Sequence, residues 1–106
     1  MYKIMTIGNK DYKLKLSIRS CVDLEKKLGT NPLNVFIRIQ ANNNELPSMN
    51  ELMLILHAML QPYEHGISID DTYDLYEQWM EEGHGLIDLM NLFTEVLEVS
   101  GFIPKN

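Results

Sequence analysis

Lysine and arginine are missing from most of this 106-residue chain: none occurs between Arg38 and Lys105. The same stretch carries twelve carboxylates, so residues 39–106 have a net charge of −11. Residues 1–38 instead hold eight cations and three acids, net +5. A charge that is divided in this way between two parts of a chain indicates a binding surface rather than a catalytic site.

The chain also lacks long apolar runs, and it has only one cysteine, Cys21. A lone cysteine forms no internal disulfide, which favours a reducing compartment. The longest apolar run, Leu52–Leu56, is far shorter than the roughly 20 residues that span a bilayer, and the first residues show no secretion signal. The net charge of −6 disfavours nucleic acid and anionic membranes as partners. We therefore expect a soluble protein of the cytoplasm.

No catalytic motif is present: the sequence contains no glycine-rich phosphate loop, nucleophile elbow or paired metal-ligand motif. His65 and His84 flank an expected helix that separates them by about 20 Å, too far for one metal ion. His57 lies in an apolar segment, where a packed histidine is the simpler interpretation. Cys21 has the spacing of a core residue and is interpreted as an inert thiol. We predict no enzyme activity, no metal and no cofactor.

Residues 1–16 alternate between apolar and polar side chains, which predicts an antiparallel hairpin. A two-residue turn at either Gly8-Asn9 or Asn9-Lys10 keeps the apolar side chains on one face, because the two registers differ by an even shift. Two strands alone are marginally stable in water, so this face must pack on helices or on another subunit. The face consists of Met5, Ile7, Tyr12, Leu14 and Leu16.

Capping residues divide residues 17–106 into about five helices, with an exposed loop predicted over residues 40–47. Ser48 with Glu51, and Ser68 with Asp71, have the spacing of capping boxes. The predicted helices cover residues 17–28, 33–39, 48–60, 68–83 and 86–100. Residues 1–106 are thus expected to form a single α+β domain, mainly α-helical, with the hairpin (1–16) followed by a small helical bundle (17–106).

The apolar positions of these helices predict how they pack. The helix over 48–60 is apolar nearly all round and belongs in the centre of the fold. On the first helix the apolar positions are Ile18, Cys21, Val22, Leu24 and Leu28. On the fourth predicted helix, one apolar stripe consists of Ile69, Tyr73, Tyr76 and Met80. Thr72 and Trp79 lie beside this stripe. Acidic residues opposite this stripe are interpreted as a solvated face, and Gly83-His84-Gly85 as a joint or a hinge.

The last predicted helix, 86–100, has more apolar surface than one core requires. Its polar residues form a face one residue wide, and this implies a partner, a self-association surface or a central position. Five of the seven methionines lie in the last three helices. Methionine either fills a core or forms a surface that adapts to irregular apolar helices.

The order of several local features resembles that of the tail assembly chaperones of long-tailed bacteriophages of Gram-positive hosts. The resemblance spans nearly the whole chain. It comprises the N-terminal hairpin, the helix end Leu24-Glu25-Lys26-Lys27-Leu28-Gly29 followed by Asn31-Pro32-Leu33, the helices rich in Glu and Leu, and the terminus Gly101-Phe102-Ile103-Pro104-Lys105.

This resemblance implies a protein without catalytic residues that binds the tape-measure protein and keeps it soluble while tail-tube subunits assemble around it. Such a protein acts in the cytoplasm of the bacterial host, is absent from the mature virion, and forms a homo-oligomer in our expectation. The residues that we expect to form or border the partner surface are Tyr76, Trp79, Met80, Met90, Phe93 and Leu97. The alternative is a structural or adaptor protein of the particle, such as a head-to-tail completion component.

Overall fold

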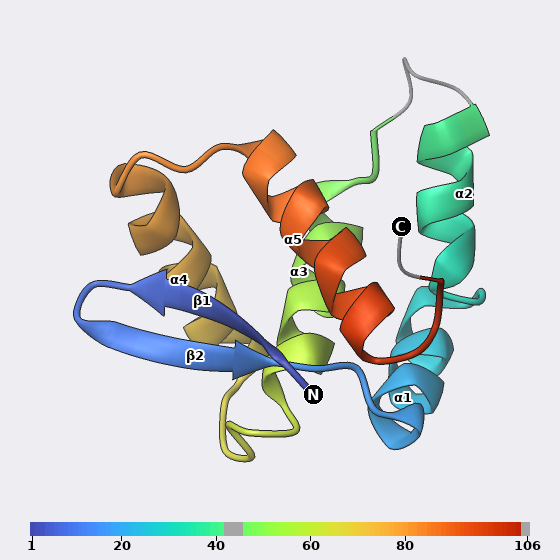
Figure 1. Cartoon of the computed structure of the whole chain (residues 1–106), viewed down its shortest axis with the longest axis horizontal. Coiled ribbons are helices and arrows are strands. Elements are labelled where there is room, and N and C mark those ends of the chain that lie inside the picture. The colour runs from blue at the N-terminus through green and yellow to red at the C-terminus, as the bar shows by residue number, and fades with distance from the viewer. Residues whose placement is uncertain (42–45, 105–106) are drawn as a thin grey trace.

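The computed structural model describes residues 1–41 and 46–104. It confirms the expected α+β class, with a hairpin followed by helices (Figure 1). The Asn42–Asn44 part of the expected loop, Glu45 and Lys105 lie outside the described residues. The elements in chain order are β1 (Lys3–Ile7), β2 (Lys10–Leu14), α1 (Ile18–Leu28), α2 (Leu33–Ala41), α3 (Met49–Leu60), α4 (Ile69–Glu81) and α5 (Leu86–Val99).

The two strands pair antiparallel, and Ile7 faces Lys10 across a two-residue turn at Gly8-Asn9. Gly8 has a φ of 63°, and no non-glycine residue among those described has a positive φ. The turn therefore has glycine at the one position that requires the left-handed region. The Gly8 amide donates to both carboxylate oxygens of Glu82, at 3.0 and 2.9 Å, and this ties the turn to the end of α4.

The expected helix caps are present. Ser17 accepts a hydrogen bond from the Ser20 amide, and both capping boxes, Ser48 with Glu51 and Ser68 with Asp71, are closed in both directions. These bonds satisfy amides at the first turns of the helices that would otherwise lack partners. The helix starts that the sequence predicted at these caps are confirmed.

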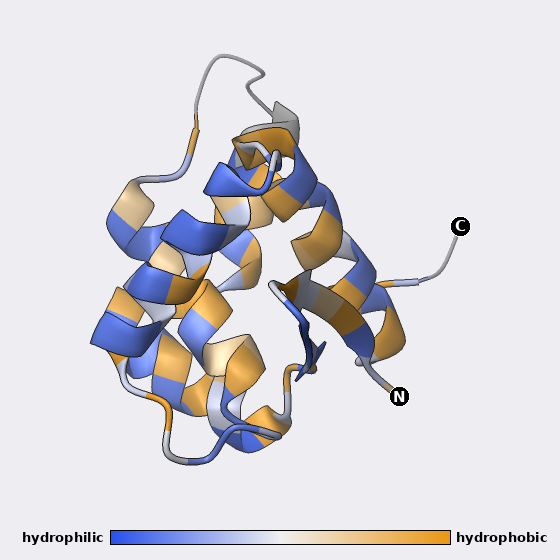
Figure 2. Ribbon diagram, turned by 90° about the vertical axis from the view of Figure 1, so that its left-hand side faces the viewer, coloured by the Kyte–Doolittle hydropathy of each residue, from blue (hydrophilic) through white to orange (hydrophobic). Residues whose placement is uncertain are grey.

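Helix α3 is the centre of the molecule, as its apolar sequence predicted. Helices α1 and α4 both pack against it, and so does β2, while β1 packs against α4 and α5 (Figure 1). Eight of its twelve residues are buried. The hairpin face expected to be apolar lies on this core, with Met5, Ile7, Leu14 and Leu16 all buried. Along the ribbons of Figure 2 polar and apolar residues alternate, as in helices that cover one core.

The faces of α1 and α4 differ from those expected. On α1 only Leu24 is buried, and Ile18 and Val22 point outward, 71% and 45% exposed. A helix of eleven residues buries only one stripe, which here includes Leu24, so the positions on its far side remain in solvent. On α4 the buried residues are Thr72, Tyr76 and Trp79, whereas Tyr73 and Met80 are each 43% exposed. The prediction that Tyr73 and Met80 belong to the buried stripe is therefore wrong. The buried face of α4 is turned toward Thr72 and Trp79.

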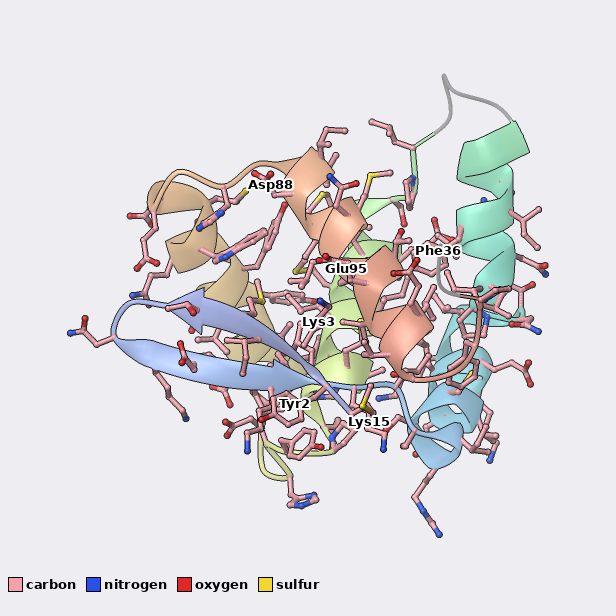
Figure 3. The ribbon with its side chains drawn as sticks, viewed as in Figure 1. Tyr2, Lys3, Lys15, Phe36, Asp88 and Glu95 are labelled. Carbon is pink, nitrogen blue, oxygen red and sulfur yellow. The ribbon has the colours of Figure 1, made fainter. Side chains whose placement is uncertain are left out.

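The basic and acidic parts of the chain meet within one molecule. Lys3 lies 3.8 Å from Glu95 (Figure 3), Lys10 lies 3.3 Å from Glu64, and Arg38 lies 2.6 Å from Glu51. Each pair joins a cation from residues 1–38 to an acid from the remainder. Because these side chains are partly exposed, each pair contributes at most about 1 kcal/mol, and their main effect is on how the elements are arranged.

Candidate functional site: an apolar groove beside α5

The six residues expected at the partner surface do not form one surface. Tyr76, Trp79, Phe93 and Leu97 are buried, at 3%, 5%, 0% and 1% exposure. Met80 is exposed on α4, and Met90 is half-buried on α5. The reason is that α4 packs on α3 and β1, while α5 packs on β1 and its Phe93 contacts Phe36 of α2, so these side chains lie in the core. Of the six, Met90 and Leu97 border an apolar hollow in the surface.

That hollow is a groove of about 300 Å³ between α2, α5 and the segment that follows α5. Most of the lining residues have apolar side chains, so the groove can bind apolar groups of a partner. Two polar residues of α5, Asn91 and Thr94, also line it. The full set of lining residues is Leu33, Phe36, Ile37, Met90, Asn91, Thr94, Leu97 and Ile103.

One wall of the groove is α2, which begins where the Asn31 side chain accepts a hydrogen bond from the Leu33 amide at 3.0 Å. Phe36 extends from α2 toward α5 (Figure 3) and packs edge-on against Phe93, with ring centroids 6.3 Å apart. The Arg38–Glu51 pair ties the same helix to the start of α3. Ile37, on the groove side, stays 59% exposed. Helix α2 is thus held in place by Phe36 and Arg38, while its apolar Ile37 stays accessible to a partner.

The opposite lip is the chain after α5, which turns back through Gly101 at a φ of 86°. The Phe102 amide donates to the Leu97 carbonyl at 2.9 Å, and the Gly101 amide donates to the Glu98 carbonyl at 3.2 Å. These two bonds define a Schellman ending. The turn brings Ile103 to the groove.

A charged pair joins the groove wall α2 to α3: Arg38 with Glu51, neither of which lines the groove. The Ser48 backbone amide donates to Glu51 and lowers the pKa of that carboxyl, and the Arg38 guanidinium beside it acts in the same direction. Thr94 donates its hydroxyl to the Met90 carbonyl at 3.1 Å, so this polar group is already satisfied. The groove therefore offers mainly apolar contacts to a partner. The Arg38–Glu51 pair lies between α2 and α3, outside the groove lining.

The remaining candidate residues have structural partners. His57 is 8% exposed, and its Nε2 lies 2.9 Å from the Ile67 carbonyl oxygen, which also accepts from Gln61. His84 stacks on the Trp79 ring at a centroid distance of 4.3 Å. Burial, with a smaller contribution from Glu25, raises the pKa of the half-buried Cys21 thiol. Across residues 1–41 and 46–104 no three His, Cys, Asp or Glu side chains gather as metal ligands.

No helix of the described part combines the length and the apolar character needed to cross a membrane. Two further hollows are more polar than the groove. One, of about 520 Å³, lies between α1 and the end of α3 and includes Arg19, Lys27 and His65 in its lining. The other, of about 470 Å³, lies between the hairpin and α4 and includes Lys10 and Asp74.

The sequence did not single out the residues of α2 and of the C-terminal segment that form the groove. A signal existed, since Leu33, Phe36 and Ile37 have the i, i+3, i+4 spacing of one helix face. The short helix was predicted from Asn31-Pro32, a cap followed by proline, and no surface was predicted from the apolar spacing. Which elements lie opposite α5 depends on tertiary packing, and only the structure provides it.

Fold and groove together define a small α+β domain, mainly helical, with an apolar groove on one side. Over residues 1–106 the chain matches the model of DUF6096, a family of unknown function, and it belongs to that family. No curated protein and no solved structure matches the chain.

Proposed function

We propose that this protein is a tail assembly chaperone of a long-tailed bacteriophage, which holds apolar helical segments of the tape-measure protein in the groove beside α5. One observation carries the proposal: the groove leaves apolar side chains of α2, α5 and the C-terminal segment open to a partner. An amphipathic helix that places its apolar face in such a groove is a common form of recognition. The role is non-enzymatic and needs no cofactor.

Two properties support this proposal. The order of hairpin, helices and closing turn agrees with the features on which the family resemblance rests. The surface is also strongly acidic, with a net charge of −6 for the chain, which keeps a complex with an apolar client in solution. The client would be held in the host cytoplasm until tail-tube subunits replace the chaperone, which would then be absent from the virion.

Because four of the six residues first expected at the surface are buried, the partner surface is now proposed to include Met90, Ile37 and Ile103, with Leu97 at its base. An aspartate at Phe93 or Tyr76 would test folding rather than binding, since both side chains are in the core. Ile37→Asp and Met90→Asp place a charge in the groove instead.

The test is co-expression with the tape-measure protein of the same phage. The original chain should move this client from the pellet into a soluble complex, and Ile37→Asp combined with Met90→Asp should abolish that. The matched control is Ile87→Asp, because Ile87 is also on α5 and 64% exposed but does not line the groove. Circular dichroism shows whether the variants are folded. A client that remains insoluble with the original chain, or one that the groove variant still retains, overturns the proposal.

Mass spectrometry of purified virions tests the other part of the proposal. A chaperone that is displaced during assembly should be absent. Its presence in stoichiometric amount would instead identify a structural or adaptor component of the particle.

A further inference from the structure

The outward face of α4 is acidic and partly apolar. Asp70, Asp74, Glu77 and Glu81 are exposed, and none of them is in an ion pair within the described part of the chain. Tyr73 and Met80 lie at the edge of this face, each 43% exposed. At 3.6 residues per turn, five positions share one sector of about 100°. This α4 face consists of Asp70, Tyr73, Glu77, Met80 and Glu81.

The outward face of α1 has the same organisation with the opposite charge. Ile18 and Val22 are 71% and 45% exposed, one turn apart. Arg19 and Lys26 share their sector, again about 100° wide, and have no ion-pair partner among the described residues. The acids of this helix, Asp23 and Glu25, flank the sector. This α1 face consists of Ile18, Arg19, Val22 and Lys26.

Within one molecule the two faces do not meet. Both helices pack against the central α3, and Figure 1 shows α4 at one end of the long axis and α1 toward the other. Other charges of the chain do find partners inside it, as the pairs Lys3–Glu95, Lys10–Glu64 and Arg38–Glu51 show. Charges of α1 and α4 that form no ion pair among the described residues thus lie on two separate faces, which are opposite in sign and both partly apolar.

We propose that two copies of this chain associate, and that the α4 face of one copy binds the α1 face of the other. In this contact Ile18 and Val22 pack against Tyr73 and Met80, while Arg19 and Lys26 meet Glu77 and Glu81. The contact joins different surfaces, so each copy keeps one face free and the assembly grows into a ring or an open chain. The inference is independent of the proposed function, because it uses neither the groove nor a client.

The contact between two short helices is smaller than the roughly 800 Å² per partner of a standard interface. The association is therefore weak and depends on protein concentration. It is also sensitive to salt, because exposed charges are screened over about 8 Å at physiological ionic strength.

Sedimentation velocity of the full chain at increasing concentration tests the inference. At low salt the average mass should rise above the 12.3 kDa of one chain, and high salt should return it toward that value. A mass that stays at 12.3 kDa at every concentration overturns the proposal.

Charge reversal identifies the faces. Arg19→Glu with Lys26→Glu, and separately Glu77→Lys with Glu81→Lys, should each weaken self-association by about tenfold or more, because like charges then face each other. Mixed in equal amounts, the two variants should associate again, since each reversed face meets its complement. Both variants retain a net negative charge, so attraction between whole molecules does not explain such a rescue.

Glu25→Lys is the control: it lies next to Lys26 and falls outside the α1 sector, and it changes the charge by +2, against −4 for the double α1 reversal. It should leave association intact. Circular dichroism verifies folding of every variant. If only one of the two reversed variants loses association, if the mixture remains monomeric, or if Glu25→Lys is as disruptive as the α1 reversal, the proposed pair of faces is incorrect.

Discussion

The two apolar sides of α5 differ in what covers them. On one side Leu89, Phe93 and Val96 are 0% exposed, where β1 packs on α5 and Phe36 of α2 contacts Phe93. On the other side Met90 is half-buried beside a hollow of about 300 Å³. Both sides have the same chemical character. The difference shows that hydrophobicity alone does not separate residues that stabilise the fold from residues left open for a partner.

The covered side is closed because several elements converge on it, whereas the open side faces a single helix and a short segment. Helix α2 touches α5 through the edge-on contact of Phe36 with Phe93, and the C-terminal segment reaches the groove through Ile103. A side chain in the closed core makes dispersion contacts all round. One at the groove keeps part of its surface available for binding.

Phe93→Ala is expected to have the largest effect on stability. Phe93 is 0% exposed and also supports Phe36, so its truncation leaves a cavity and should cost about 3–5 kcal/mol. For a domain whose total stability is about 5–15 kcal/mol, this is a large fraction. Urea unfolding followed by circular dichroism measures it.

The same measurement on Ile37→Ala provides the comparison, because Ile37 lies at the groove and is 59% exposed. Its truncation should change stability by no more than about 0.5 kcal/mol. Similar losses for the two variants would mean that α2 is part of the core, and the distinction between the two sides of α5 would disappear.

Gly101→Ala tests the lip of the groove and should have an intermediate effect. Gly101 has a φ of 86°, and an added Cβ would meet no atom within 4 Å, so the cost is backbone strain alone. That strain amounts to about 1–2 kcal/mol. The expected result is a lower urea midpoint together with faster amide exchange at Phe102, whose amide closes the turn on Leu97. Unchanged exchange at Phe102 would show that the turn does not depend on this glycine.

Much of the fold was predictable because local signals decide it. The cap at Ser48, the glycine at 29 and the hairpin turn each act through bonds between neighbouring residues, although the sequence left two turn positions open, Gly8-Asn9 and Asn9-Lys10. Such bonds form in any tertiary context that keeps the chain compact. The helix starts and the hairpin were therefore predictable from the sequence.

The faces of the helices were harder to predict. On α4, Tyr73 and Tyr76 were placed in one stripe, yet Tyr76 is buried and Tyr73 is 43% exposed. Both are apolar enough to fit either environment, and the choice depends on how α4 meets α3 and β1. The groove depends in the same way on the position of α2. Sequence periodicity gives the width of an apolar face but not the element that will cover it.

Acid should affect the groove side before the core, and this is the smallest effect that we expect. Hydrogen bonding from the Ser48 amide, together with Arg38, holds the pKa of Glu51 below its ordinary value of 4.5. A lowered pKa in the folded state means that the ionised carboxylate stabilises the fold above pH 4.5, and that this stabilisation is lost as the pH falls through the lowered pKa. The pKa of Asp71 is lowered as well, by hydrogen bonds from Ser68, so it adds to the same loss.

Because Arg38 belongs to α2 and Glu51 to α3, protonation of Glu51 loosens the helix that forms one wall of the groove. The protection of the α2 amides, measured relative to their intrinsic exchange rate at each pH, should therefore fall below pH 4.5 while the amides around Phe93 stay protected. Glu51→Gln should flatten this pH dependence, since it removes the titrating group, and Asp71→Asn is the matched change at the α4 cap that should leave α2 unaffected. Equal responses of α2 to the two variants would mean that acid acts on the domain as a whole, and that the groove wall is no less firmly held than the core.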